Sequence, residues 1–307
     1  MRALLVVNPA ATATSARTRD VLARALGSRL KVDVAETRHR GHACELARQA
    51  RRDDFEVVLA LGGDGTVNEV VNGLLAAGIA AAPALGVLPG GSTNVFARAM
   101  GLPADPVEAT GQILDALQQN RRRVIGLGRA DERWFTFCAG LGLDAEVVDL
   151  VERSRAAGRL SSPALYLAAA VRHFYLGTDR RSPALTLQVD GQAPEDRLYQ
   201  AIVCNTAPWT YLRARPVNPL PLASFDTGLD VFALRRLTTS ATLRCVARIL
   251  VPGRRPPRTS AALLRHDLGG FTLRSTRPLA FQVDGDALGR RTVVRFTSVP
   301  EALHVLV

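Results

Sequence analysis

The chain has 307 residues, which is long for one core and enough for two domains, and its hydrophobic fraction of 47% is that of an ordinary soluble protein. It carries 39 lysine and arginine residues against 28 aspartate and glutamate residues, a net charge of +11, and Lys31 is its single lysine. Its arginine clusters contain no interleaved aromatic residues to stack on bases, so an anionic lipid surface is a better partner for them than nucleic acid. A solvated basic face without a partner is the alternative.

The chain begins with a short apolar segment, residues 3–7, which predicts a strand and is too short for a signal peptide. No apolar run reaches membrane-spanning length, because the longest one, residues 76–88, is broken by Pro83. Four widely separated cysteines without metal-ligand spacing predict buried free thiols: Cys44, Cys138, Cys204 and Cys245. Together these features predict a cytoplasmic protein.

Strand and helix patterns alternate along the first ~125 residues. Short apolar runs predict strands at 3–7, 31–36, 56–61 and 84–88. Apolar residues spaced by three and four predict helices at 15–26, 43–51, 67–77, 94–100 and 106–117. This alternation is typical of a parallel sheet with helices on its faces.

A glycine turn with the sequence GGDGT, residues 62–66, lies between the third predicted strand and the following helix. Glycines let backbone N–H groups approach an anion closely, and a helix N-terminus adds a positive dipole, so this turn predicts a phosphate site. Asp64 is unexpected in such a turn, because a carboxylate repels phosphate. Its presence indicates chemistry or a metal rather than simple anion binding.

A second glycine turn, Pro89-Gly90-Gly91, follows the fourth predicted strand, and Ser92, Thr93 or Asn94 is expected to cap the next helix. Two glycine turns at the carboxyl ends of adjacent parallel strands are expected to form one cleft. The pattern is not the Walker phosphate loop, since Gly-Lys-Ser/Thr is absent, and it is not the GxGxxG dinucleotide fingerprint.

The pattern changes after the basic run at residues 121–123. Short β segments are predicted at 134–138, 184–189, 198–204, 229–234, 271–274, 279–283 and 292–296, with one helical insertion at about 145–174. Asp144 follows the Gly140-Leu141-Gly142 segment, and nothing in its spacing assigns it a role. The second part of the chain is therefore expected to be mostly antiparallel β structure.

The segments GGDGTVNEVVNGL, residues 62–74, and LPGGSTNVFARAMGLP, residues 88–103, resemble the diacylglycerol kinase catalytic domain of bacterial lipid kinases, which are related to sphingosine kinases. NAD kinases and phosphofructokinases share GGDGT, whereas the second block is typical of the lipid kinases alone. Asn8-Pro9 resembles the family's first turn, and QVDGD, residues 282–286, resembles its late QVDGE segment.

The resemblance implies an α/β fold with an N-terminal parallel-sheet nucleotide-binding domain, a C-terminal antiparallel β-sandwich domain, and an active-site cleft between them. The expected ATP-binding domain is 1–126, with the C-terminal strand 297–307 as a candidate to return to it, and the expected lipid-substrate domain is 127–296. ATP and Mg²⁺ are the implied cofactors. The implied acceptor is the hydroxyl of diacylglycerol or a related lipid alcohol, and the product is phosphatidic acid or an analogue.

By the same resemblance, the nucleotide is expected to contact Asn8, Thr37, Gly62, Gly63, Gly65, Thr66, Ser92 and Asn94. Two carboxylates compete as general base. The sphingosine kinases use the aspartate of the first turn, here Asp64, and the bacterial diacylglycerol kinases point to the glutamate of DGE, here Asp286. Because Asp286 is shorter than that glutamate by about one C–C bond, Asp64 is favoured as essential and Asp286 as a partner for Mg²⁺ or water.

The chain departs from the family pattern at two further places. The lysine expected soon after Asn8-Pro9 is missing, and Arg17 or Arg19 could supply its charge. In the segment 223–228, Thr227 replaces an aspartate that helps to bind a structural divalent cation in relatives. Asp226 is therefore the remaining candidate metal ligand, and that metal site is in doubt.

Two other functions stay open, namely a non-catalytic lipid- or nucleotide-binding relative and a soluble-metabolite kinase of the NAD type. Retention of Asp64 argues against the first and the GGSTN block against the second. We expect transient, peripheral attachment to the anionic inner membrane surface, and a homodimer is left open. An apolar stripe on residues 240–251 either lies on a bilayer beside Arg254, Arg255 and Arg258 or packs on the β domain.

Overall fold

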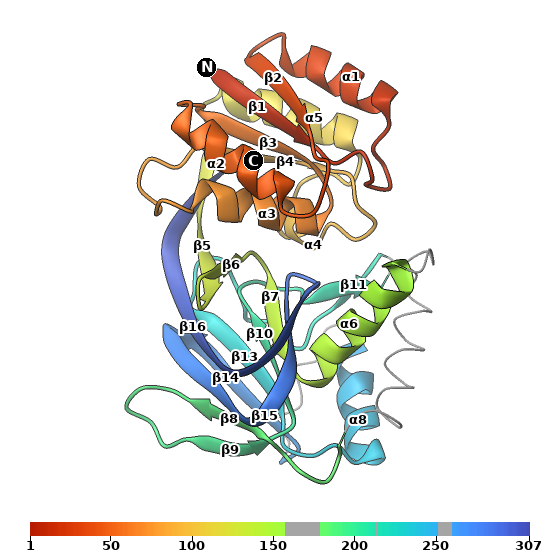
Figure 1. The fold of residues 1–307 in the computed structure, drawn as a ribbon, viewed down its shortest axis with the longest axis vertical. Coiled ribbons are helices and arrows are strands. Elements are labelled where there is room, and N and C mark those ends of the chain that lie inside the picture. The colour runs from red at the N-terminus through yellow and green to blue at the C-terminus, as the bar shows by residue number, and fades with distance from the viewer. Residues whose placement is uncertain (157–178, 213, 251–259) are drawn as a thin grey trace. The chain divides into compact units, whose positions relative to one another are not determined.

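The computed structural model describes residues 1–156, 179–212, 214–250 and 260–307. They form two compact units (Figure 1). The first unit is Met1–Leu127 together with Glu301–Val307, and the second is Gly128–Pro300. Among the helices of the described residues, none combines the length and the apolar character needed to cross a membrane.

The first unit is built on a parallel sheet with the strand order β4-β3-β1-β2. Its strands are β1 (Arg2–Val7), β2 (Lys31–Glu36), β3 (Val57–Gly62) and β4 (Ala84–Pro89). The end of β16 (Asp286–Leu306) adds to this sheet, because Val305 pairs in parallel with Leu85 on β4. Strands β3 and β4 are buried along their whole length, which explains their nearly continuous apolar sequence.

Helices cover both faces of this sheet. They are α1 (Ala16–Leu26), α2 (His42–Arg52), α3 (Asp64–Leu74), α4 (Val95–Ala99) and α5 (Pro106–Gln118). Helices α1 and α5 pack together over the face that carries Leu5 and Leu59, and α2 packs on α3 at the opposite face (Figure 1). The loops after β1, β3 and β4 therefore gather at one edge of the sheet, where parallel strands end.

The second unit is built on an antiparallel sheet with the path β14-β13-β10-β7-β15-β16. Its strands are β6 (Arg133–Phe135), β7 (Cys138–Leu141), β8 (Leu185–Gln188), β9 (Glu195–Leu198), β10 (Gln200–Cys204), β13 (Leu229–Leu234), β14 (Ala262–Leu268), β15 (Gly270–Val283), the first part of β16 and the end of β5 (Arg122–Ala130). Strands β11 (Thr210–Leu212) and β12 (Arg215–Val217) form a separate ribbon. Among its described residues this unit also has helices α6 (Leu143–Ala156) and α8 (Thr239–Leu250).

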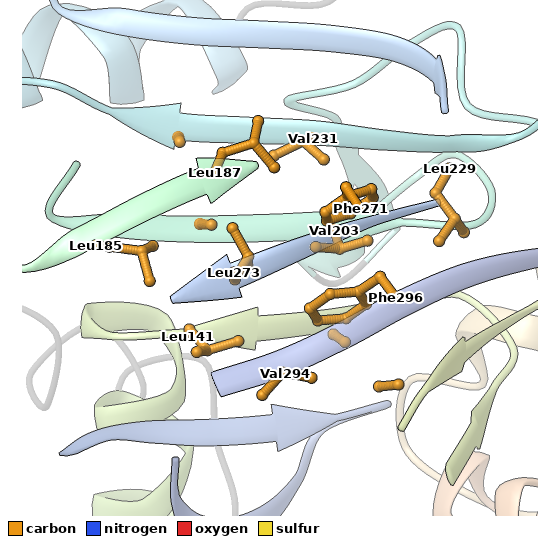
Figure 2. Close-up of a cluster of buried hydrophobic side chains, with 14 of the residues drawn as sticks. Leu141, Leu185, Leu187, Val203, Leu229, Val231, Phe271, Leu273, Val294 and Phe296 are labelled. Atoms are coloured by element: carbon orange, nitrogen blue, oxygen red, sulfur yellow. The ribbon is translucent and has the colours of Figure 1, made fainter. Parts of the chain in front are cut away.

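The core of the second unit lies on the inward face of this sheet, as Figure 2 shows. The rings of Phe271 and Phe296 stack there with their centroids 5.1 Å apart, on neighbouring strands β15 and β16. Leu141, Val203 and Val231 continue the same layer across β7, β10 and β13. Alternating inward residues of this kind hold an antiparallel sheet together mainly by burying apolar surface.

The predicted fold class is confirmed, since a parallel α/β part is followed by an antiparallel β part. The assignment of 1–126 to ATP and 127–296 to the lipid stays a prediction. The helix predicted at 67–77 begins three residues earlier, at Asp64, because Gly63 already takes the extended N-cap conformation. Strands β5 and β14 were not predicted, because arginines flank the apolar part of β5 and the polar run Arg265-His266-Asp267 interrupts β14.

Free thiols were predicted for all four cysteines, and the structure contains no disulfide among them. Cys138, Cys204 and Cys245 are buried, whereas Cys44 is half-buried, so its predicted burial was too strong. Burial raises the pKa of the Cys138 and Cys204 thiols well above the ordinary value, which keeps them protonated and unreactive. The predicted helical insertion begins at Leu143, and its part at 157–174 lies outside the described residues.

Candidate nucleotide-binding site at two glycine turns

The two predicted glycine turns lie against each other in the first unit. Strands β3 and β4 pair in register up to Gly62 and Pro89, and the Gly90 N–H donates to the Gly62 carbonyl over 2.8 Å. A Cβ added to Gly91 would lie 2.6 Å from the Cα of Gly63. Only glycine permits so close an approach of two backbones, so the turns form one continuous main-chain surface.

Asn94 holds the second turn in shape. Its Oδ1 accepts from the Gly91 N–H over 2.9 Å, and its Nδ2 donates to the Gly91 carbonyl over 2.8 Å. Asn94 occupies the N-cap position of α4 with a left-handed φ of 49°, a conformation that asparagine tolerates better than most residues. These contacts give Asn94 a structural task, and its predicted contact with nucleotide stays a prediction.

The carboxylate of Asp64 bridges the two turns. Its Oδ2 accepts from the Val95 N–H over 2.9 Å, and its Oδ1 accepts from the Phe96 N–H over 3.0 Å. Both donors belong to the first turn of α4, where backbone N–H groups lack helical partners. The negative charge of Asp64 is thus directed at α4, which explains how a carboxylate can stand in a phosphate-type turn.

Residues at the ends of β1 and β2 extend the same edge. The Asn8 Nδ2 donates to the Thr66 Oγ1 over 3.0 Å, which ties the β1 loop to the first turn of α3. The Asn8 Oδ1 accepts from the Ala10 N–H, and the Thr37 N–H donates to the carbonyl of Val7. Asn8, Thr37 and Thr66 therefore lie at neighbouring strand ends, as the sequence predicts for a shared site.

The loop after β1 also carries a residue that sequence reasoning missed. The Ala13 N–H donates to the Gly90 carbonyl over 2.9 Å, which brings Thr14 beside the second turn. The Thr14 Oγ1 is buried and, among the described residues, finds no hydrogen-bond partner. A buried hydroxyl without a partner marks a place that a ligand or water completes. Its only sequence signal is a threonine close after the Asn8-Pro9 turn.

The missing lysine is not replaced by Arg19. Its guanidinium pairs with Asp20 over 2.7 Å and with Glu36, and these hydrogen bonds raise its pKa from the ordinary value. Both partners neutralise its charge locally, so little positive potential is left for a phosphate. Arg17 is exposed on α1 and remains the candidate that the sequence named.

The loop before α2 is held by Glu69 of α3. Its two carboxylate oxygens accept from the Gly41 N–H over 2.8 Å and from the Ala43 N–H over 3.1 Å. Within the described residues, one group of three side chains could gather around a metal ion: His39, His42 and Glu45. The His42 Nδ1 already accepts from the Arg38 N–H, so the geometry favours a capping role over metal binding.

In the second unit, Asp286 begins β16 directly after a tight turn. Val283 pairs with Asp286 across the turn residues Asp284 and Gly285, whose φ values are 48° and 83°. Left-handed conformations at both central positions are typical of a two-residue hairpin turn. The turn therefore fixes the backbone that precedes Asp286, whose carboxylate is the second candidate general base.

Asp284 anchors this turn, a role that the sequence did not indicate. Its buried carboxylate accepts from the N–H and Oγ1 of Thr136 over 2.7 and 2.9 Å. It also accepts from the N–H groups of Phe137 and Cys138, each over 3.0 Å. A buried carboxylate with four donors is well compensated for its lost hydration.

Asp226 lies in a loop before β13 that is held by local contacts. Its N–H donates to the Ser224 Oγ over 3.2 Å, and Thr227 donates to the Ser224 carbonyl. Asp226 does not belong to the one group of possible metal ligands found in the described part of the chain. Its predicted role as a ligand of a divalent cation stays a prediction.

Comparisons with known proteins place this geometry in context. Residues 2–127 match the family model for the diacylglycerol kinase catalytic domain. The chain is 40% identical over 103 residues to the diacylglycerol kinase of Bacillus subtilis (strain 168), covering 33% of this chain and 32% of that protein. It is 40% identical over 126 residues to "Probable lipid kinase YegS-like" of Chromohalobacter salexigens, covering 41% and 39%. The matched segments thus span less than half of these relatives.

A crystal structure of a diacylglycerol kinase from Bacillus anthracis str. Sterne has the same fold, with a TM-score of 0.72. The superposition covers 99% of this chain and 96% of that chain at 17% sequence identity. This likeness extends beyond the family match, through the second unit. Residues 2–127, with the two glycine turns they contain, are thus similar to the diacylglycerol kinase catalytic domain, and the whole chain shares the fold of a diacylglycerol kinase.

Proposed function

We propose that this protein is an ATP-dependent lipid kinase that transfers the γ-phosphoryl group of ATP to the hydroxyl of diacylglycerol or a related lipid alcohol. The observation that carries the proposal is the contact between the glycine turns at Gly63 and Gly91, inside the segment that matches the family. Relatives of this segment are named as diacylglycerol or lipid kinases. The product is then phosphatidic acid or an analogue.

The phosphates are proposed to lie at the start of α3. Gly63 caps this helix without a side-chain hydrogen bond, so the first-turn amides of Gly65 and Thr66 are proposed to donate to a phosphate. Ser92 of the second turn is exposed and supplies a hydroxyl at the same edge. Gly62, Asn8 and Thr37 complete the proposed nucleotide contacts, while Asn94 shapes the turn that carries Ser92.

Asp64 and Asp286 are the proposed catalytic carboxylates. Two amide hydrogen bonds stabilise a carboxylate in its ionised form, so the contacts of Asp64 favour a task in holding the two turns as well as in chemistry. Asp286 is proposed to accept the hydroxyl proton or to orient water. Mg²⁺ is proposed to arrive with the nucleotide and to neutralise charge on the transferred group.

Phosphoryl transfer itself tests the proposed function. We expect the purified protein, given radiolabelled ATP, Mg²⁺ and a mixed lipid extract, to label a lipid that co-migrates with phosphatidic acid or an analogue. Label in a soluble metabolite such as NAD would instead identify a soluble-metabolite kinase. ATP or lipid binding without any transfer would identify a non-catalytic relative, and either outcome contradicts the proposal.

Changes at Asp286 are expected to affect turnover more than ATP binding. Asp286→Glu restores the side chain of the family and should preserve or raise the rate, whereas Asp286→Ala should lower it about 100-fold. Rates at saturating Mg-ATP and calorimetric ATP titrations measure the two effects. Asp190→Ala, which removes an exposed carboxylate from another hairpin turn of the same unit, is the control. Wild-type rates for both Asp286 variants would show that this residue only forms the turn and has no part in catalysis.

A membrane-docking surface on α8 is part of the proposal. Leu243 is 63% exposed and Val246 is 44% exposed, while Cys245 between them is buried. The alternative that the stripe packs on the β strands therefore does not hold for these two residues. Arg244 and Arg248 are exposed beside the stripe, and α8 contains no acidic residue. An apolar stripe flanked by arginines fits an anionic bilayer surface.

This surface predicts salt-sensitive binding to anionic vesicles. Changing Arg244 and Arg248 together to serine removes about 2 kcal/mol of attraction, which corresponds to roughly 30-fold weaker binding to phosphatidylserine-containing vesicles at low salt. Cosedimentation measures it, with pure phosphatidylcholine vesicles as the neutral reference. The control is a variant with Arg121 and Arg122 changed to serine, which loses the same two positive charges outside α8.

Equal weakening by the two double variants would show a general charge effect and contradict a surface on α8. Unchanged binding of the α8 variant across a salt series would exclude this helix outright. Arg254, Arg255 and Arg258, which the sequence analysis adds to this surface, lie outside the described residues.

A further inference from the structure

Behind the turn that carries Asp286, a short chain of polar groups runs into the second unit. Asp144 lies in the first turn of α6, and its Oδ2 accepts from the Gln282 Nε2 over 2.8 Å. The Gln282 Oε1 in turn accepts from the Gly285 N–H over 3.0 Å. Gly285 immediately precedes Asp286. A carboxylate on a helix is thus connected, through one amide side chain, to the backbone of the turn.

The amide of Gln282 can take only one orientation in this place. Gln282 is 1% exposed, its Nε2 also approaches the Cys138 Sγ at 3.7 Å, and its oxygen faces a backbone donor. A flipped amide would set its oxygen against the Asp144 carboxylate and its NH₂ group against the Gly285 N–H. Asp144 therefore selects the orientation that supplies Gly285 with an acceptor.

From this geometry we infer that Asp144 is a positioning residue for Asp286, acting through Gln282 on the backbone of the Asp284–Gly285 turn. Asp284 fixes one side of the turn through its four donors, and the Asp144–Gln282 pair fixes the other. Rates are sensitive to misplacement of a catalytic group by about 1 Å, on the order of 100-fold. The catalytic part of this inference rests on the proposed function, whereas the part about the turn does not.

The ionised state of Asp144 costs the protein stability. Burial raises the pKa of Asp144 from 3.8 to about 6, although the hydrogen bond from Gln282 opposes the shift. The arginines of β15 lie earlier in that strand than Gln282 and do not contribute to this shift. Among the described residues, the titratable groups that interact with Asp144 from β7 and β10 are the thiols of Cys138 and Cys204, and neither is a cation. An ionised carboxylate beside these neutral thiols therefore costs stability.

The direction in which removal of the Asp144 charge changes stability separates a positioning role from a merely structural one. The folded protein binds the Asp144 proton more tightly than the unfolded chain does. Protonation of Asp144 therefore adds to the free energy of unfolding, fully below pH 3.8, and this contribution is lost as pH rises through about 6. Asp144→Asn keeps an acceptor for Gln282 and removes the charge. We expect the variant to melt at a higher temperature than wild type at pH 8 and at the same temperature near pH 3.8.

The same variant is expected to lose activity although it gains stability. Asp144→Asn should lower kcat for lipid phosphorylation about 10-fold and leave the KM for ATP unchanged. The reason is that the asparagine amide can flip and present its NH₂ group to Gln282, whereas both oxygens of a carboxylate are acceptors. Asp149→Asn is the matched control, since Asp149 lies on the same helix, partly exposed and paired with Arg153. A kcat within twofold of wild type for Asp144→Asn, in protein that phosphorylates lipid, would overturn the inference.

Exchanging the carboxylate of Asp144 and the amide of Gln282 between the two positions provides a rescue test. Gln282→Glu alone sets two carboxylates against each other and should lower kcat further than Asp144→Asn. In the double variant Asp144→Asn/Gln282→Glu, the amide introduced on α6 can donate to the new carboxylate, which still accepts from the Gly285 N–H. We expect kcat to recover to within about threefold of wild type. No recovery in a double variant with wild-type melting behaviour would contradict the proposed route through Gln282.

Hydrogen exchange of the Gly285 amide keeps this inference separate from the proposed function. If wild type transfers phosphate to no lipid, the proposed function fails, but the turn can still be tested. The Gly285 N–H should then exchange about 10-fold faster in Gln282→Glu than in wild type and return toward the wild-type rate in the double variant, by NMR at pH 8. Equal exchange rates in all three proteins would refute the positioning role itself.

Discussion

Asp64→Asn is expected to lower the rate of phosphoryl transfer roughly 100- to 10,000-fold, the range that loss of a general base produces. The structure adds a second reason for a large loss. An asparagine side chain at this position has one oxygen and one NH₂ group, so it can accept from only one of the Val95 and Phe96 amides and confronts the other with a donor. Leaving that amide without an acceptor costs about 1–3 kcal/mol of stability.

Two measurements separate the chemical role of Asp64 from its structural one. If Asp64 acts mainly as base, turnover at saturating ATP falls while the Kd for ATP stays close to wild type. If it mainly holds the turns together, α4 and Ser92 shift, and the Kd for ATP rises more than turnover falls. Activity within a few-fold of wild type at an unchanged melting temperature would exclude both roles.

Asp105→Asn is the matched control for this experiment. Asp105 caps α5 and accepts from the N–H groups of Val107 and Glu108 over 2.8 and 3.1 Å, much as Asp64 accepts from two amides of α4. It lies outside the glycine turns, so its replacement should cost about 1 kcal/mol of stability at most and leave kinase activity intact. Loss of activity in this variant would show that a weakened helix cap alone explains the effect at Asp64.

Much of the first unit could be predicted because its sequence and its structure obey the same local rules. The predicted strand at 31–36 coincides with β2, and the strand ends at Gly62 and Pro89 fall where the glycine turns begin. Buried parallel strands read as continuous apolar runs and glycine marks their ends, so short-range pattern carries the information. The start of α3 was misplaced because Asp64 and Gly65 do not look like helix interior.

The contacts that organise the candidate sites were harder to predict because they join residues far apart in sequence. Asp64 meets the amides of α4 31 and 32 positions later, and Asp284 meets Thr136 148 positions away. A sequence motif states which residue types are present but not which donors face them. For that reason the sequence indicates chemistry or a metal for Asp64 but not its contacts with α4, and it assigns no role to Asp144, Asp284 or Thr14.

Gly91→Ala is expected to abolish ATP binding by forcing the two glycine turns apart. The added Cβ would lie 2.6 Å from the Cα of Gly63 and 2.8 Å from the Asn94 Oδ1, and the first of these contacts is with backbone. Because a backbone cannot rotate away as a side chain can, the turns must shift, at a cost of about 1–3 kcal/mol of stability. A shift of about 1 Å at the phosphate site should lower kcat/KM for ATP on the order of 100-fold or more.

Alanine substitutions at two further glycines provide comparisons for Gly91→Ala. At Gly63 the added Cβ would lie 3.3 Å from the Gly91 Cα, so Gly63→Ala should impair ATP binding in the same direction but less. At Gly111, inside α5, a Cβ meets nothing within 4 Å, so Gly111→Ala should gain about 0.5–1 kcal/mol of stability and keep full activity. Calorimetric ATP titration and thermal melting measure all three variants. Wild-type ATP affinity in Gly91→Ala would mean that the contact between the turns is dispensable, and the proposed phosphate site would lose the observation on which it rests.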